Sequence, residues 1–199
     1  YISPFFYLIY IIITDFYQCI QLHLFIDYIF LLLYNNYYYI IVWRLIMIEI
    51  NCAVPDFTLM GSDNQEHKLS QYRGKKVILY FYPRDNTPGC STEACNFRDS
   101  NDVFINKNAI IIGISRDSLK SHTKFIEKFN LPFILLSDEK EEVCNLFNVI
   151  KEKNMYGKKV FGIERSTFII NEEGILIKEY RKVKVKDHVS TVLKDLELL

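Results

Sequence analysis

Two cysteines near the middle of the chain, Cys90 and Cys95, have the surroundings of reactive thiols. Cys90 follows a strongly apolar run and a loop with two prolines, so it stands at the beginning of the helix predicted next. The N-terminus of a helix carries a partial positive charge and unpaired N–H groups, which favour a thiolate over a thiol. Because a free thiol with a pKa of about 8.5 is mostly protonated at neutral pH, this position predicts a nucleophilic Cys90.

Thr87 lies three residues before Cys90, where its hydroxyl can hydrogen-bond the sulfur or the oxygen that the sulfur attacks. The alternative for Cys90 is a small buried hydrophobic residue, which is the usual situation of a lone cysteine. The Pro/Gly loop, the helix start and the second cysteine five residues later all favour the reactive interpretation.

The spacing of Cys90 and Cys95 makes a mechanical prediction. Five residues along a helix give a rise of about 7.5 Å and a rotation of about 140°, so the two Cα atoms lie roughly 8–9 Å apart. A disulfide requires Cα atoms within about 7 Å of each other. The two cysteines therefore cannot bond inside an intact helix, and local unwinding must accompany their oxidation.

The apolar pattern predicts the elements that position these cysteines. Val77–Tyr82 is a continuous apolar, β-rich run ended by Pro83, as in a strand buried on both faces. The helix predicted after the loop has apolar residues at helical spacing and continues to about Asn106. Ala109–Ile114 and Phe133–Leu136 are the next predicted strands.

Later segments complete an alternation of strands and helices. Three further helices are predicted from their N-cap signals, at Asp117 or Ser118, at Asp138 in a capping box with Glu141, and at Asp187. Thr167–Ile170 and Ile175–Ile177 flank a turn signal and predict an antiparallel hairpin. Together these elements indicate a single α/β domain over residues 47–199, with a central mixed sheet flanked by helices.

The residues around Cys90 resemble a known active-site signature. Pro83-x-x-x-Thr87-x-x-Cys90, followed by Cys95, is similar to the motif of the peroxiredoxins, in particular the bacterioferritin comigratory protein or peroxiredoxin Q subfamily. The resemblance covers almost all of residues 47–199 and none of residues 1–46. Other segments that match are Pro55–Phe57, Tyr80–Pro83, Gly113–Ser115, Leu136–Asp138 and Gly162–Phe168.

The resemblance implies a thioredoxin-like fold and the reduction of hydrogen peroxide or organic hydroperoxides without a metal, haem, flavin or other cofactor. By position, Cys90 would attack the O–O bond and become a sulfenic acid, and Cys95 would condense with it to an intramolecular disulfide. Thr87 would orient the thiolate and the peroxide, and Pro83 would shield the pocket from water. Arg165 matches the active-site arginine, whose fixed charge stabilises both the thiolate and the transition state.

The resemblance also implies a partner and a state of assembly. An external dithiol protein such as thioredoxin would reduce the disulfide. The chain is expected to be a monomer, because the resolving cysteine lies in the same chain as the one it resolves. Reactive cysteines suit a reducing cytosol, where disulfides are transient and catalytic, so a cytoplasmic protein is expected.

Two other functions are compatible with the sequence. A thioredoxin-like protein disulfide oxidoreductase would need a C-x-x-C pair that opens and closes without large rearrangement, and the spacing here disfavours it. A membrane-tethered redox sensor would require residues 1–46 to be a membrane segment. Nucleic acid is not an expected partner, because the chain has 24 basic and 24 acidic residues and no basic patch with interleaved aromatics.

Residues 1–46 differ sharply in composition from the rest of the chain. Of these 46 residues, 35 are hydrophobic, and Gly, Ala, Lys, Glu and Met are absent. A signal peptide would need a basic start and a small-residue cleavage site. The segment has no Lys, its one Arg is Arg44 at the far end, and it has no Ala or Gly for a cleavage site. A membrane-spanning helix would need about 18 consecutive apolar residues, and Asp15 and Asp27 interrupt the run. Because A/T-only codons encode Ile, Tyr, Phe, Leu and Asn, and Met47 is the first methionine, we expect residues 1–46 not to be native protein; a membrane segment is the alternative.

The other cysteines and the histidines carry weaker signals. Cys144 lies on the apolar side of a predicted helix, which predicts a buried and inert thiol. His67, His122 and His188 are isolated in polar surroundings and show no spacing that would join them to the two central cysteines as a zinc site. No metal is therefore expected.

Overall fold

The structure, a computed structural model, describes residues 48–155 and 158–198. These residues belong to one compact unit, Met47–Leu199. The prediction that residues 1–46 are not native protein, or else a membrane segment, lies outside the described residues. None of the helices in the described part of the chain has the length and apolar character needed to span a bilayer.

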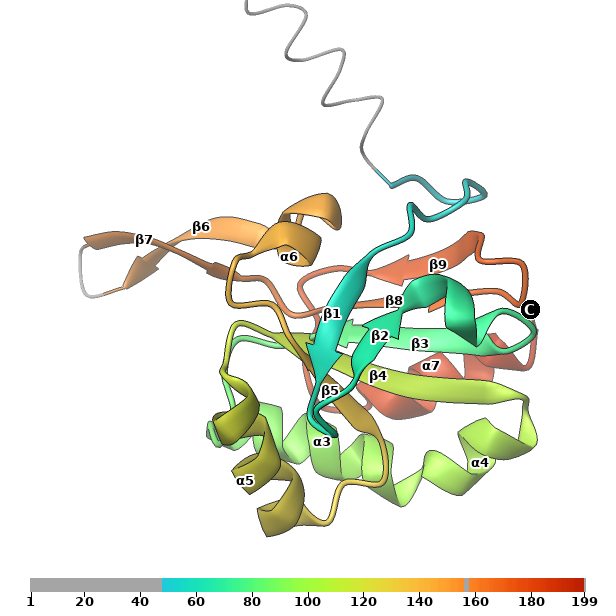
Figure 1. Cartoon of the computed structure of the whole chain (residues 1–199), viewed down its shortest axis with the longest axis horizontal. Helices are drawn as coiled ribbons and strands as arrows, with labels where there is room; N and C mark the ends of the chain where they lie inside the picture. Colours follow the sequence, from blue (N-terminus) through green and yellow to red (C-terminus); the bar gives the residue numbers. More distant parts are fainter. Residues whose placement is uncertain (1–47, 156–157, 199) are drawn as a thin grey trace, which may run out of the picture. The chain divides into compact units, whose positions relative to one another are not determined.

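A seven-stranded mixed sheet forms the centre of this unit (Figure 1). Its strands are β1 (Thr58–Gly61), β2 (Glu66–Lys68), β3 (Lys76–Phe81), β4 (Ala109–Ser115), β5 (Ile134–Ser137), β8 (Ser166–Ile170) and β9 (Leu176–Tyr180). They lie in the order β2-β1-β5-β4-β3-β8-β9. The central strands β5, β4 and β3 are parallel, and the flanking pairs are antiparallel, including the predicted β8–β9 hairpin. The predicted mixed sheet is confirmed.

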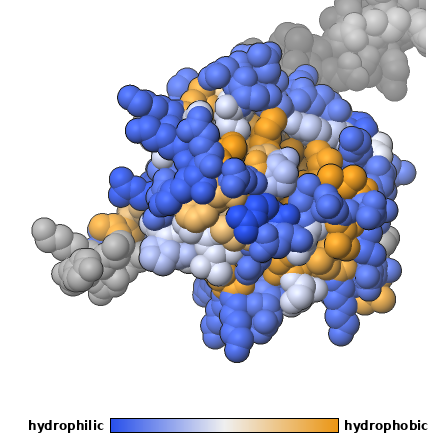
Figure 2. Space-filling view, turned by 90° about the horizontal axis from the view of Figure 1, so that it is seen from below, coloured by the Kyte–Doolittle hydropathy of each residue, from blue (hydrophilic) through white to orange (hydrophobic). Residues whose placement is uncertain are grey.

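Helices cover both faces of the sheet. They are the 3-10 helix η1 (Leu69–Tyr72) and the α-helices α3 (Pro88–Asp99), α4 (Asn101–Asn106), α5 (Leu119–Phe129), α6 (Glu142–Leu146) and α7 (His188–Leu196). Figure 1 shows α3, α4, α5 and α7 on one side of the sheet and α6 on the other. Seen from below, the surface is mostly hydrophilic, with hydrophobic side chains showing between the hydrophilic ones (Figure 2).

Strand β3 is buried on both faces, as its continuous apolar sequence predicted. Ile78 and Tyr80 pack in one core cluster with residues of α3, α5 and α7. Val77 and Leu79 pack in a second cluster with residues of α6 and β8. Because alternate residues of the strand are buried on opposite faces, the point where the chain leaves β3 for the cysteine loop is fixed by both cores.

The helical segment after the loop differs from the prediction of one helix to about Asn106. Helix α3 ends at Asp99, and Ser100 has non-helical backbone (φ −104°, ψ 2°) before α4 begins. The change of direction at Ser100 keeps Phe97 and Phe104 fully buried, with ring centroids 5.9 Å apart. Serine is a common residue at such breaks because its hydroxyl competes with the helical hydrogen bonds.

The predicted capping box before α6 is wrong. Glu141 is the residue before the helix, but its backbone is left-handed (φ 60°) and its carboxylate binds Arg116 at 2.6 Å. The Asp138 carboxylate instead accepts a hydrogen bond from the backbone N–H of Cys144 at 2.7 Å. The Glu141 side chain is therefore engaged elsewhere and cannot reach back to the helix start.

A two-stranded ribbon, β6 (Ile150–Met155) paired antiparallel with β7 (Lys158–Ile163), was not predicted. Its sequence is rich in lysine and carries little of the apolar alternation that marks a half-buried strand. The ribbon projects from the sheet in Figure 1, and β7 leads directly into the segment that carries Arg165.

Candidate active site

Cys90 lies in the first turn of α3, as the sequence predicted. Thr87 is the extended residue before the helix, and Pro88 is its first residue, where a missing N–H costs no hydrogen bond. The first helical bond runs from the Ser91 N–H to the Thr87 carbonyl at 2.8 Å, so the N–H of Cys90 precedes the bonded ladder. Cys90 therefore lies at the positive end of the helix, and only 1% of it is exposed.

Arg165 contacts the Cys90 sulfur although 75 residues separate them. Its Nη2 donates to Cys90 Sγ at 3.2 Å. The sheet register explains this approach, because Phe81 at the end of β3 pairs with Ser166 at the start of β8. The Arg165 carbonyl is also fixed, since it accepts a hydrogen bond from the Val183 N–H at 2.9 Å. Strand pairing thus sets a guanidinium against the cysteine.

Glu93 is a third member of this cluster, and the sequence did not reveal it. It lies one turn after Cys90 in α3, its side chain is 0% exposed, and its Oε2 accepts a hydrogen bond from Arg165 Nη1. Its Oε1 has no hydrogen-bond partner in the structure. Burial raises the pKa of Glu93 from 4.5 to about 7, although the charge and hydrogen bond of Arg165 act in the opposite direction. Arg165 therefore bridges a buried acid and the cysteine.

The raised pKa of Glu93 predicts a pH dependence of stability. Between pH 4.5 and about 7 the folded protein retains a proton on Glu93 that the unfolded chain has released. The stability contributed by this proton is complete below pH 4.5 and is lost as the pH rises through about 7. Denaturant unfolding of Glu93→Gln, whose side chain cannot ionise, should therefore show a smaller fall in unfolding free energy over this window. A difference between the two proteins that stays constant with pH would contradict the assignment.

Thr87 and Pro83 lie in the loop that joins β3 to α3, where the sequence placed them. The Thr87 hydroxyl does not cap the helix; its Oγ1 donates to the Arg84 carbonyl at 3.1 Å. Pro83 is half-buried just beyond the end of β3. All the predicted site residues except Cys95 therefore lie at one edge of the sheet, where β3 ends and α3 and β8 begin. They are Pro83, Thr87, Cys90 and Arg165.

Cys95 is half-buried in the same helix as Cys90, and both are free thiols. Because α3 is unbroken between them, the structure shows the reduced arrangement that helix geometry requires. Cys144 is fully buried, and burial, with the charge and hydrogen bond of Asp138, raises the pKa of its thiol. The prediction of a buried Cys144 is confirmed. Cys52 is exposed.

The three histidines are buried but have polar partners: His67 lies beside Asp63, His122 beside Asp85 and His188 beside Thr167. His67, His122 and His188 are 7%, 0% and 6% exposed. Among residues 48–155 and 158–198, no three His, Cys, Asp or Glu side chains are grouped so that they could hold a metal ion.

Comparisons with known proteins agree with this geometry. Residues 50–179 match the model of the AhpC/TSA family. "Peroxiredoxin Bcp" of Bacillus subtilis is 55% identical over 150 residues, which cover 75% of this chain and 96% of that relative. A solved structure of Xanthomonas campestris bacterioferritin comigratory protein, studied for alkyl peroxide reduction, is 44% identical and has a TM-score of 0.71. It covers 76% of this chain and 96% of its own chain.

The sheet is thioredoxin-like and carries a buried cysteine at a helix start, beside an arginine. Together with these relatives, this arrangement defines the class of protein as a thiol peroxidase. The chain belongs to the AhpC/TSA family, within its Bcp or peroxiredoxin Q group, as the signature around Cys90 predicted.

Proposed function

We propose that the domain over residues 47–199 reduces hydrogen peroxide and organic hydroperoxides through a Cys90 sulfenic acid and a Cys90–Cys95 disulfide. Thioredoxin or a similar dithiol protein resets the enzyme, which acts as a monomer in the cytoplasm. The observation that carries this proposal is the 3.2 Å contact of Arg165 Nη2 with Cys90 Sγ at the N-terminus of α3.

In the first step the Cys90 thiolate attacks one oxygen of the peroxide. An S–O bond forms, the O–O bond breaks, and the other oxygen leaves as water or an alcohol after taking up a proton. The sulfur is oxidised to a sulfenic acid and the peroxide is reduced. Arg165 stabilises the thiolate before attack and the negative charge that develops on the leaving oxygen, in a site where burial of the sulfur strengthens both interactions.

Thr87 and Pro83 arrange this step. The Thr87 hydroxyl has a single proton, and it is donated to the Arg84 carbonyl. The lone pairs of Thr87 Oγ1 can therefore accept a hydrogen bond from the O–H of a hydroperoxide. Pro83 has no N–H and presents an apolar ring at the end of β3, which keeps water away from the thiolate.

In the second step the Cys95 thiol attacks the Cys90 sulfenic acid, an S–S bond forms, and water leaves. Helix α3 must unwind locally for this to happen. The start of α3 lacks a side-chain cap and has no acidic residue in its first turn. Because such a cap typically contributes about 1 kcal/mol, its absence lowers the cost of opening the first turns.

A Cys95→Ser variant should separate the two steps. It is expected to consume about one equivalent of peroxide per chain and then stop, because the sulfenic acid has no internal thiol to condense with. Small thiols in the buffer should restore slow turnover. Intact mass after peroxide treatment should show one added oxygen, and sustained thioredoxin-dependent turnover would contradict the assigned role of Cys95.

The reductant is tested by following NADPH oxidation with thioredoxin reductase, thioredoxin and hydrogen peroxide. The proposal predicts saturable turnover that requires all components. A protein disulfide oxidoreductase would instead reduce insulin without needing peroxide. Insulin reduction at rates similar to peroxide reduction would favour that second function. Turnover that occurs with small thiols but not with thioredoxin would overturn thioredoxin as the reductant.

A further inference from the structure

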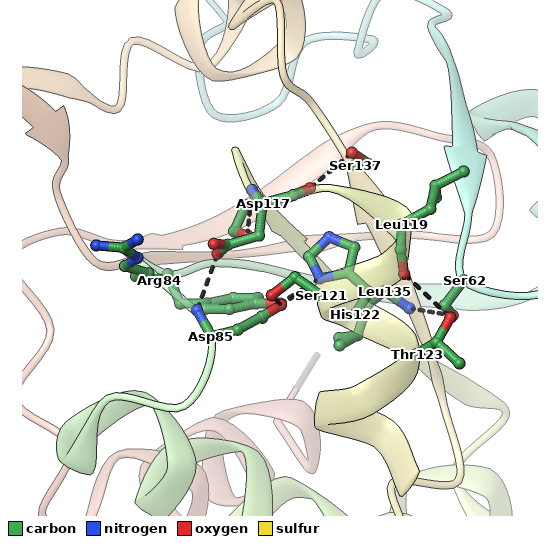
Figure 3. A network of polar contacts seen from close by, with 12 residues as sticks. Ser62, Arg84, Asp85, Asp117, Leu119, Ser121, His122, Thr123, Leu135 and Ser137 are labelled. Carbon is green, nitrogen blue, oxygen red and sulfur yellow. Dashed lines mark hydrogen bonds and ion pairs between the residues drawn. The ribbon is translucent and has the colours of Figure 1, made fainter.

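The loop that carries Thr87 is attached to the neighbouring strand and helix by a polar network (Figure 3). Strands β3 and β4 are parallel, so the loops that follow them leave the sheet at the same edge. This arrangement places Asp85, in the loop after β3, beside Asp117, which follows β4. Figure 3 shows the Asp117 side chain joined to the backbone nitrogen of Asp85, with Ser121 and His122 of α5 nearby.

The Asp85 carboxylate is buried and has several partners. Tyr82 Oη donates to Oδ1 at 2.8 Å, Ser121 Oγ donates to Oδ2 at 2.7 Å, and His122 Nδ1 lies 2.9 Å from Oδ2. His122 is fully buried, and its Nε2 lies 3.3 Å from the Leu136 carbonyl. Both ring nitrogens of His122 therefore face acceptor oxygens.

The pKa of Asp85 agrees with an ionised carboxylate in this network. Burial acts to raise the pKa, but the hydrogen bond and charge of His122, with the hydrogen bonds of Ser121 and Tyr82, lower it overall. A buried carboxylate with this many donors is held in one geometry. The loop is therefore anchored to α5 through the Asp85 side chain.

A second anchor acts on the backbone of the same residue. The Asp85 N–H donates to Asp117 Oδ2 at 2.8 Å. The same oxygen accepts a hydrogen bond from Ser115 Oγ at 2.8 Å, which ties the carboxylate to the end of β4. The Asp85 N–H and the Arg84 carbonyl belong to one planar peptide group. That carbonyl is the acceptor of the Thr87 hydroxyl at 3.1 Å.

The peptide group between Arg84 and Asp85 therefore links the position of the Asp117 carboxylate to the orientation of the Thr87 hydroxyl. A carboxylate binds its N–H end, and the Thr87 hydroxyl binds its carbonyl end. Because the group is planar and rigid, rotation at one end would displace the acceptor at the other. Thr87 would then be free to turn its proton toward the sulfur or the peroxide.

We propose that Asp117 and Asp85 are positioning residues for the peroxidase reaction, because together they fix the peptide group that orients the Thr87 hydroxyl. This inference rests on the role proposed above for Thr87. Neither carboxylate contacts the Cys90 sulfur in the hydrogen bonds described, so each acts through the loop.

The test compares Asp117→Ala with Asp117→Asn. Every variant also carries Cys95→Ser, so that only the oxidation of Cys90 by peroxide is followed. Both hydrogen bonds described for the Asp117 carboxylate use the same oxygen, so the carbonyl oxygen of asparagine can keep them while the charge is lost. Asp117→Ser, whose side chain is too short to reach the loop, is the second variant if the alanine variant does not fold. Ser137→Ala is the matched control, because it removes a hydrogen bond to the Asp117 carbonyl and leaves the carboxylate in place.

Two rates are measured for each variant: oxidation of Cys90 by hydrogen peroxide and its alkylation by iodoacetamide, which needs no oriented hydroxyl. Asp117→Ala should lower the peroxide rate constant by about 10- to 100-fold, as expected for a misplaced reacting group. Alkylation should change by less than about twofold, and Asp117→Asn and Ser137→Ala should stay within about threefold in both reactions. If the effect passes through Thr87, Asp117→Ala should cause no further loss in a Thr87→Val background.

The outcomes separate this inference from the proposed function. An impaired Thr87→Val together with additive effects of the two substitutions would overturn the inference and leave the function intact. An asparagine variant as slow as the alanine variant would also overturn it, because charge and not position would then matter. A Thr87→Val variant with the wild-type rate would overturn both the role of Thr87 and this inference.

Discussion

A Cys90→Ser variant is expected to lose at least about a thousandfold in peroxidase turnover, because the nucleophile that accepts the peroxide oxygen is gone. The serine hydroxyl can occupy the buried position beside Arg165 but is not ionised at neutral pH. The fold should persist, since the two side chains are of similar size and Cys90 makes no disulfide in the structure. Thioredoxin-coupled turnover and thermal unfolding, measured on the same sample, check both expectations.

Cys52→Ser is the matched control for this experiment. Cys52 is exposed near the start of the described residues, so its substitution should change turnover by less than about twofold. Wild-type turnover in Cys90→Ser would remove the central residue of the mechanism. Equal losses in both variants would point to a general effect of thiol removal.

Arg165→Met is expected to reduce both activity and stability. Loss of the guanidinium should lower the rate of Cys90 oxidation by about a hundredfold or more, as for removal of other preorganised donors in buried sites. It also leaves Glu93 buried without its partner, which should lower the free energy of unfolding by about 3–5 kcal/mol. The destabilisation should be smaller at acidic pH. Burial raises the pKa of Glu93, and the variant lacks the Arg165 charge that lowers it, so Glu93 can take up a proton there.

The double variant Arg165→Met with Glu93→Gln distinguishes these two effects. Neutralising the buried acid should recover most of the lost stability, measured by denaturant unfolding. It should not recover the rate of Cys90 oxidation, because the donor to Sγ is still absent. Recovery of both would mean that Arg165 serves only to compensate Glu93.

The parts of the fold that could be predicted from sequence are those with a strong apolar period. The buried run Val77–Tyr82 and the β8–β9 hairpin follow from patterning alone. The ribbon of β6 and β7 could not be found this way, since its lysine-rich sequence carries little apolar alternation. The break between α3 and α4 at Ser100 could not be predicted either, because the apolar spacing continues through it.

The site shows the same division. The cysteine at a helix start and its Thr87 are visible in a few adjacent residues, and Arg165 came from the family signature. Glu93 looks like any surface glutamate in a helix, and only the packing of α3 shows that it is buried. Asp85 and His122 lie 37 positions apart, so their pairing depends on the sheet topology that brings two loops to one edge. Sequence spacing cannot express such long-range contacts.

The most direct test of the central claim is the intact mass of the native protein before and after one equivalent of hydrogen peroxide, followed by peptide mapping. The mechanism predicts a loss of two hydrogens, located in a disulfide between Cys90 and Cys95. A stable added oxygen on Cys90 with a free Cys95, or a disulfide that involves Cys52 or Cys144, would contradict it.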